Sequence, residues 1–122
     1  MTNYDDNNIF AKILREEIPC DKVYEDGFVL AFNDISPQAP VHILVIPKGA
    51  YTDINDFGVR GTPEEISGFW KAVSQIVEQT GLEKDGFRTI ANTGTHGGQE
   101  VPHFHAHILG GDNLGPMISR LS

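Results

Sequence analysis

A chain of 122 residues fits one compact domain, and we expect a single domain over residues 1–122. Hydrophobic residues make up 39% of it and charged residues 21%, which is ordinary for a soluble globular protein. The formal net charge of −8 argues against binding to a nucleic-acid backbone, which needs a basic surface, but it permits binding of one small nucleotide.

The sequence predicts no membrane segment, because it contains no apolar run long enough to cross a bilayer. The polar and acidic residues 1–8 lack the basic and apolar regions of a signal peptide. Cys20 has no second cysteine with which to form a disulfide within the chain. Together these features predict a cytoplasmic protein.

The first predicted element is a short helix over residues 8–17, in which Ile9 and Ile13 recur at helical spacing. Pro19 is expected to close this helix, because the residue before a proline disfavours helical backbone angles.

Three strands are predicted next. Residues 22–25 and 28–32 are joined by Asp26-Gly27, which predicts a tight hairpin because glycine accepts a positive φ at little cost. The two prolines within residues 34–40 predict a loop. Residues 41–46 are almost continuously apolar, which is typical of a central strand.

A longer helix is predicted over residues 63–80, with Thr62 as its N-cap and Gly81 as its stop signal. Two further strands are predicted at residues 87–91 and 103–109. The short links between strands favour an α+β fold: a five-stranded antiparallel sheet with two helices, both expected on one side.

Three histidines alternate with apolar residues in the last strand. His103, His105 and His107 would share one face of a strand, and Phe104 and Ala106 would face the core. One alternative is that the three are simply exposed polar positions. Another is a metal site completed by His42, although a single cysteine makes a structural zinc less favoured.

The pattern also suits chemistry at phosphorus. A neutral imidazole is a nucleophile, and protonated imidazoles beside it would stabilise the charge of the transition state. The glycine-rich residues 92–99 come directly before the histidines. Such a stretch lets backbone amides approach a phosphate closely, although alone it is weak evidence.

These features resemble the histidine-triad (HIT) family, in its nucleotide-binding phosphoramidase (HINT-like) branch. The family signature, three histidines alternating with apolar residues, corresponds to residues 103–109 and is followed by Gly110-Gly111. The resemblance covers about residues 8–111. Further matching segments are residues 10–13, 17–19, 24–26, 34–40 with His42, and 45–48.

The resemblance implies a hydrolase that cleaves purine nucleoside phosphoramidates and releases a nucleoside monophosphate. His105 resembles the nucleophile that becomes a nucleotidyl-histidine, while His103, His107 and His42 resemble residues that orient it or bind phosphate. The resemblance also implies a homodimer with one continuous sheet, and no cofactor or metal ion. Two alternatives stay open: a dinucleoside polyphosphate hydrolase, or a nucleotide-binding regulator with little turnover.

The same resemblance implies a nucleotide pocket. Asp34 resembles the residue that holds the ribose hydroxyls, a sensible task for a carboxylate acceptor. Phe10 and Phe32 are equally compatible with plain core packing. The base-pocket wall corresponds to Ile9, Phe10, Phe32 and Ile35, and the phosphate-loop positions correspond to Asn92, Gly98 and Gln99.

The sequence departs from the family pattern in three places. Glu100 stands where animal members carry a serine that assists the leaving group, so it is either a protonated acid or turned away. Asn8, Ala11 and Ala50 replace two cysteines and a histidine of zinc-binding relatives, which further lowers the expectation of zinc. Residues 112–117 lack the ending of animal members, which leaves the substrate preference open.

Overall fold

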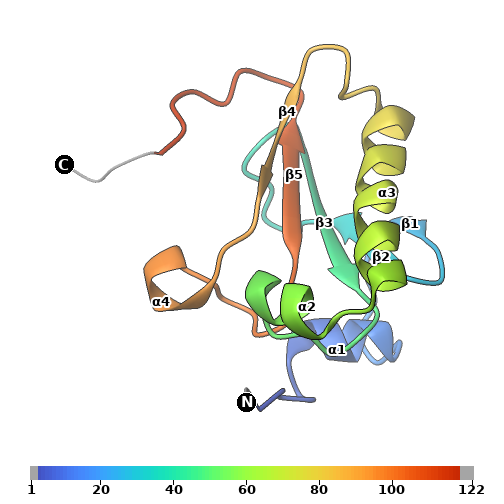
Figure 1. The fold of residues 1–122 in the computed structure, drawn as a ribbon. Coiled ribbons are helices and arrows are strands. Elements are labelled where there is room, and N and C mark those ends of the chain that lie inside the picture. The colour runs from blue at the N-terminus through green and yellow to red at the C-terminus, as the bar shows by residue number, and fades with distance from the viewer. Residues whose placement is uncertain (1–2, 119–122) are drawn as a thin grey trace.

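The computed structural model describes residues 3–118. It consists of a single β-sheet with helices packed around it (Figure 1). All strand pairs are antiparallel, in the order β1-β2-β3-β5-β4, which confirms the predicted α+β fold with a five-stranded antiparallel sheet. The elements are α1 (Ile9–Leu14), β1 (Lys22–Glu25), β2 (Val29–Asn33), β3 (Val41–Pro47), α2 (Ile54–Arg60), α3 (Pro63–Thr80), β4 (Phe87–Ile90), α4 (Gly94–Gly97) and β5 (Ala106–Gly110).

Helix α1 is shorter than predicted. Its start is fixed by the side chain of Asn8, which accepts a hydrogen bond from the backbone N–H of Ala11 at 2.9 Å. The helix ends at Leu14, and Glu16 then adopts a positive φ of 63°. The expectation that Pro19 closes the helix is therefore wrong, because the left-handed residue Glu16 has already turned the chain away.

The hairpin between β1 and β2 forms where the sequence predicts it, but for another reason. Gly27 is not among the residues with positive φ. The carboxylate of Asp26 instead accepts hydrogen bonds from the backbone N–H groups of Phe28, at 2.8 Å, and Val29, at 3.0 Å. These side-chain hydrogen bonds stabilise the turn, which the sequence had led us to attribute to a positive φ at glycine.

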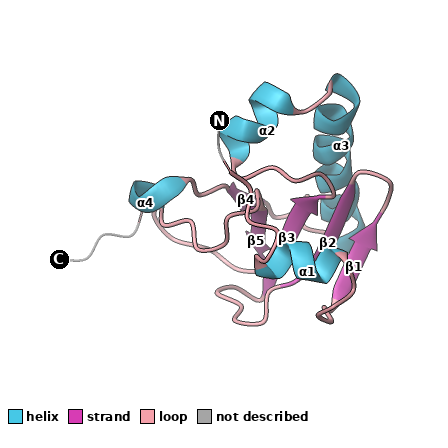
Figure 2. Cartoon of the chain, turned by 90° about the horizontal axis from the view of Figure 1, so that it is seen from below, coloured by secondary structure: helices cyan, strands magenta, loops and turns pink. Residues whose placement is uncertain are grey.

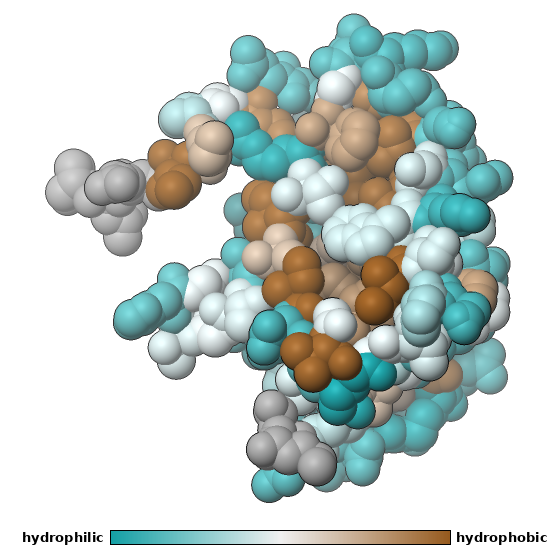
Figure 3. Space-filling view, in the orientation of Figure 1, coloured by the Kyte–Doolittle hydropathy of each residue, from teal (hydrophilic) through white to brown (hydrophobic). Residues whose placement is uncertain are grey.

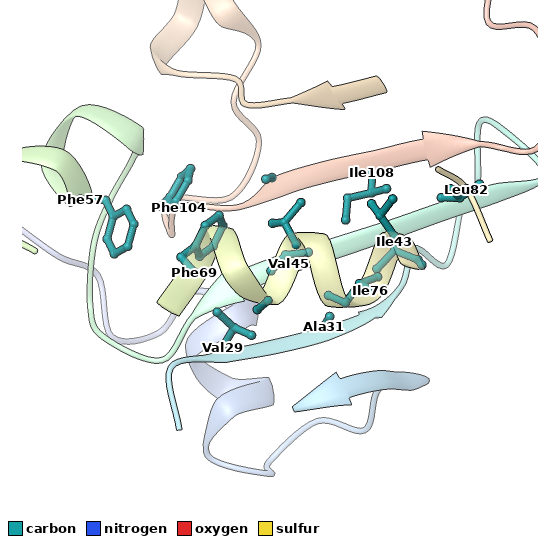
Figure 4. Close-up of a cluster of buried hydrophobic side chains, with 14 of the residues drawn as sticks. Val29, Ala31, Ile43, Val45, Phe57, Phe69, Ile76, Leu82, Phe104 and Ile108 are labelled. Carbon is teal, nitrogen blue, oxygen red and sulfur yellow. The ribbon is translucent and has the colours of Figure 1, made fainter. Parts of the chain in front are cut away.

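Helix α3 follows its sequence signals from end to end. Thr62 and Glu65 form a reciprocal capping box at its start, and Gly81 ends it in the left-handed conformation with φ 76°. Its buried side chains, among them Phe69 and Ile76, pack against alternate residues of the sheet (Figure 4). This cluster forms the larger of the two cores.

Helices cover both faces of the sheet, which corrects the expectation that they share one side. Along β3, Ile43 and Val45 face the α3 core, whereas Leu44 and Ile46 pack against α1 on the opposite face. Figure 2 shows α1 in front of the strands and α3 behind them. This double coverage explains why β3 is apolar at successive positions rather than alternate ones.

Two short helices were not predicted. Helix α2 begins where the Asp53 side chain accepts from Asp56 N–H at 2.7 Å, and it buries Phe57 against the α3 core. Helix α4 is a single turn within the glycine-rich segment. Between residues 3 and 118, no helix has both the length and the apolar character needed to cross a membrane.

Candidate functional site

The three clustered histidines do not all lie on one strand. Strand β5 begins at Ala106, so only His107 belongs to it. His103 and His105 precede the strand in an irregular segment, where Phe104 N–H donates to the Tyr51 carbonyl at 2.7 Å. The predicted strand over residues 103–109 therefore starts too early, although Phe104 and Ala106 do face the core as expected.

Burial rules out the alternative that these histidines are exposed polar positions. The exposed fraction is 0% for His103, 6% for His105 and 4% for His42, and His107 is half-buried. Buried polar groups need hydrogen-bond partners, and each of these rings has at least one. Those partners fix which ring nitrogen carries the proton.

The hydrogen bond of His105 leaves one of its nitrogens free for attack. Its Nδ1 lies 2.7 Å from the carbonyl oxygen of His103. Because a carbonyl can only accept, Nδ1 carries the hydrogen and Nε2 keeps its lone pair. The ring packs edge-on against Phe10, at 5.0 Å between centroids, and against His107, at 5.1 Å.

His42 and His107 form a directed pair. The backbone N–H of Gln38 donates to His42 Nδ1 at 3.1 Å, so the proton of the neutral ring is on Nε2. That Nε2–H donates to His107 Nδ1 at 2.9 Å, which leaves His107 with an N–H at Nε2. The carboxylate of Asp34 lies 3.5 Å from His42 Nε2 and completes the group.

His103 is bonded at both ring nitrogens. Its Nε2–H donates to the Pro47 carbonyl at 2.9 Å, and its Nδ1 accepts from the hydroxyl of Tyr4 at 2.6 Å. Tyr4 was not predicted as a site residue from the sequence. No local pattern could have indicated it, because the contact joins residues 99 positions apart.

The electrostatics of the site favour neutral imidazoles. Burial, aided by the neighbouring His105, lowers the pKa of His103 and that of His107 to about 4. Burial also lowers the pKa of His105, against the opposing effects of the His103 carbonyl and the charges of Asp34 and Glu100. The expected protonated imidazoles are therefore not found at His103 and His107 near pH 7, where neutral N–H groups are the available donors.

A pocket of about 560 Å³ opens beside His105, bounded by α1, the loop after β2 and the segment before β5. It brings together most of the residues singled out from the sequence. Those lining it are Ile9, Phe10, Phe32, Asp34, Ile35, Asn92, Gly98, Glu100, His105 and His107.

Three predicted residues lie outside the pocket lining: His42 and His103 behind it, and Gln99 beside it. The Gln99 amide donates to the carbonyls of Thr52, at 2.7 Å, and Val101, at 2.9 Å, so it connects this loop to the segment before α2. Other lining residues were missed, among them Cys20 and Leu44. Leu44 could have been found, because strand alternation places it on the same face as His42.

Glu100 lies at the edge of the pocket with its side chain exposed. Its negative charge opposes the effect of burial, which lowers the pKa of His105. Within residues 3–118 it forms no ion pair or side-chain hydrogen bond. The side chain is therefore neither buried nor held by a partner within the part of the chain that the structure describes.

One cluster of side chains in the site contains residue types that can bind a metal ion. Ligand atoms of Asp34, His42 and His107 lie within 4.8 Å of one another. His42 Nε2 and His107 Nδ1 are joined to each other by a direct hydrogen bond of 2.9 Å. At the N-terminus of α1, Asn8 is buried as the helix cap, where zinc-binding relatives would place a cysteine.

A sequence model of the HIT domain matches residues 15–114. The purine nucleoside phosphoramidase of Escherichia coli (strain K12) is 51% identical over 115 residues, 93% of this chain and 95% of that protein. An uncharacterized HIT-like protein of Azospirillum brasilense is 54% identical over 117 residues, 96% of each chain. The solved histidine triad protein from Clostridium difficile superposes with a TM-score of 0.85 at 43% identity, covering 95% of this chain and 100% of that one. The chain therefore belongs to the HIT, or histidine-triad, family.

Proposed function

We propose that the protein hydrolyses purine nucleoside phosphoramidates through a nucleotidyl intermediate on His105. The observation that carries the proposal is the tautomer of His105, whose Nδ1–H is held by a carbonyl while the Nε2 lone pair stays free beside the pocket. The 51% identity to a purine nucleoside phosphoramidase supports the substrate class.

In the first step, His105 Nε2 forms a bond to phosphorus and the P–N bond of the substrate breaks. The departing nitrogen keeps the electron pair of that bond and takes up one proton, supplied by a water molecule or by the protonated form of the Glu100 side chain. The imidazole ring becomes cationic, and the carbonyl of His103 stabilises the charge through the Nδ1–H bond.

In the second step, a water oxygen bonds to phosphorus and gives its proton to the Glu100 carboxylate or to bulk water. The bond between phosphorus and Nε2 breaks, its electron pair returns to His105, and the nucleoside monophosphate leaves. The Nε2–H of His107 and the backbone amide of Gly98 can donate to the phosphate oxygens in both steps. Asp34 would accept from the ribose hydroxyls, with Phe10 and Phe32 beside the base.

The test is turnover of an adenosine phosphoramidate by the His105→Ala variant. We expect a loss of several powers of ten, because covalent nucleophiles commonly contribute that much. His96→Ala is the matched control, since His96 is exposed on α4 outside the pocket and should leave the rate unchanged. A variant that is folded, by its melting temperature, and keeps a tenth of the rate would refute the assignment.

Glu100 supports a second candidate, a nucleotide-binding regulator with little turnover. An exposed carboxylate at the pocket edge repels a phosphate group, and a serine at that place in animal members would not. A regulator would bind a nucleoside monophosphate without forming a covalent adduct, whereas the hydrolase would form one.

We also propose that β4 pairs with a second copy of the chain to give a homodimer. β4 is an edge strand, and such edges are open to pairing with another chain. Phe87, on this strand, is 42% exposed, and Figure 3 shows apolar side chains gathered in the middle of this view, with hydrophilic ones around them. Light scattering should give twice the chain mass of 13.4 kDa, and a mass of 13.4 kDa would contradict the dimer.

A further inference from the structure

The segment before α1 contributes a hydrogen bond to the interior of the site. Tyr4 lies only four residues before the N-cap Asn8, and its hydroxyl donates to His103 Nδ1 at 2.6 Å. The two rings meet edge-on, with centroids 5.6 Å apart and planes at 71°. Because His103 is 0% exposed, this hydroxyl satisfies a ring nitrogen that water does not reach in the folded state.

This hydrogen bond is one end of a continuous series. Tyr4 holds His103 Nδ1, the Pro47 carbonyl holds His103 Nε2–H, and the main-chain carbonyl of His103 holds His105 Nδ1–H. With both nitrogens bonded, the His103 ring cannot rotate without losing a partner. The series therefore fixes the residue whose carbonyl sets the tautomer of His105.

The backbone around His103 does not provide that rigidity by itself. The residue lies outside β5, so no sheet ladder holds it. Its own N–H bonds only the nearby Val101 carbonyl, at 2.9 Å, within the same irregular segment. Side-chain anchoring of His103 is thus the main long-range restraint on its carbonyl, together with the following Phe104 N–H bond to Tyr51.

We propose that Tyr4 is a positioning residue for the hydrolysis, acting on His105 through the ring and carbonyl of His103. The inference rests on the proposed function. The His105 ring is neutral in the free protein and cationic in the nucleotidyl intermediate, so the bond from its Nδ1–H to the His103 carbonyl strengthens as the reaction proceeds. A misplaced carbonyl therefore slows the chemical step more than it weakens substrate binding.

The kinetic test compares Tyr4→Phe with Tyr24→Phe. Tyr24 is a matched control, because its hydroxyl also bonds a side chain, that of Asp26 at 2.8 Å, but lies outside the site. Tyr4→Phe should lower kcat about threefold to tenfold, as expected for one lost hydrogen bond, and leave KM and AMP affinity within about twofold. Tyr24→Phe should leave kcat unchanged.

A purely structural role for Tyr4 gives a different result. Tyr4→Phe keeps the ring and removes only the hydroxyl, so equal kcat in the wild type and Tyr4→Phe, with a loss only in Tyr4→Ala, would overturn the proposal. A decrease in kcat no larger than that of Tyr24→Phe would overturn it as well.

Nitrogen-15 NMR of the histidine rings tests the same series without turnover. In the wild type, His103 should be protonated at Nε2 and should accept a hydrogen bond at Nδ1. Tyr4→Phe should shift the His103 Nδ1 resonance toward that of a free ring nitrogen and perturb His105 Nδ1, and no shift at either would refute the proposal. This measurement stays informative even if the wild type does not cleave phosphoramidates, so the two failures are distinguishable.

Discussion

At the scale of single residues, the tautomers of the site's histidines are set by main-chain groups, one of them 56 positions away for His103 and near neighbours for His42 and His105. The carbonyl of Pro47, the backbone N–H of Gln38 and the carbonyl of His103 each fix one ring. The sequence predicted which histidines gather, because their spacing is local. It could not predict their charge, because the lowered pKa values follow from burial in the folded structure.

Asp34 provides the first prediction. Replacing it with alanine should weaken AMP binding by roughly tenfold to a hundredfold, because a charged acceptor of buried hydroxyls contributes about 1.5–3 kcal/mol. It should also abolish the preference for ribose over deoxyribose, measured by calorimetric titration with both nucleotides. Because Asp34 also accepts from Ser36 N–H at 2.8 Å, Asp34→Asn serves as the control for loop geometry. If Asp34→Ala still preferred ribose over deoxyribose by the wild-type ratio, Asp34 would not be the residue that binds the ribose hydroxyls.

The second residue-scale prediction concerns Glu100, whose side chain lines the pocket that also holds His105. If it donates the proton to the leaving nitrogen, Glu100→Gln should greatly slow hydrolysis of a phosphoramidate with a poor amine leaving group. An activated substrate whose leaving group needs no proton should be slowed little. Equal losses for the two substrates would assign the proton to water or to another group.

At the scale of elements, helix α3 and the central strand β3 were predicted within a residue or so, because capping and periodicity are local signals. The start of β5 was not. Its last ladder pair is Val45 with Ala106, and beyond it the chain bonds to Tyr51 instead of a strand. Such a departure depends on tertiary contacts, as does helix α2, which is too short for a clear helical period.

The capping box of α3 gives the element-scale prediction. Thr62→Ala removes the acceptor for Glu65 N–H and should lower the free energy of unfolding by about 1 kcal/mol in urea titrations. Thr80→Ala is the control at the other end of the same helix, where the hydroxyl bonds the Ile76 carbonyl and caps nothing. Turnover should be unchanged in both. Equal stability of Thr62→Ala and the wild type would contradict the assigned cap.

At the scale of the whole molecule, the sheet separates the main core from the site. The α3 core lies on one face, while the pocket, α1 and the Leu44 side of β3 lie on the other. The sequence predicted the sheet and its helices but placed the helices on one side, because periodicity does not say which face a short helix covers. This separation is why we expect pocket variants to affect activity more than folding.

Buried neutral histidines predict a pH dependence of stability for the whole chain. The pKa of His103 is about 4 in the folded state and near 6.5 when unfolded, so between these values the unfolded chain binds more protons. The contribution of the neutral His103 ring to the free energy of unfolding is fully present above its unfolded-state pKa, and it is lost as the pH falls from that value toward 4. From about pH 7.5 to about pH 5, the free energy of unfolding should fall by about 2 kcal/mol through His103 alone, with His107 acting in the same direction.

Urea titrations at several pH values test this. The carboxyl groups with the lowest pKa values, Glu25 and Asp56 at about 2, lose their contribution only at lower pH and do not confound this window. His103→Gln should flatten the dependence, and His96→Gln, which changes an exposed residue, should preserve it. A wild-type stability that is constant across the window would contradict neutral burial of these rings.

The central claim is that His105 becomes covalently nucleotidylated, and intact-mass spectrometry under single-turnover conditions tests it most directly. Protein in excess over an adenosine phosphoramidate, quenched rapidly in alkaline denaturant, should gain the mass of one adenylyl group, and peptide mapping should place it on His105. His105→Ala should gain none. Substrate consumption without an adduct at any time point, or an adduct on another residue, would contradict the account.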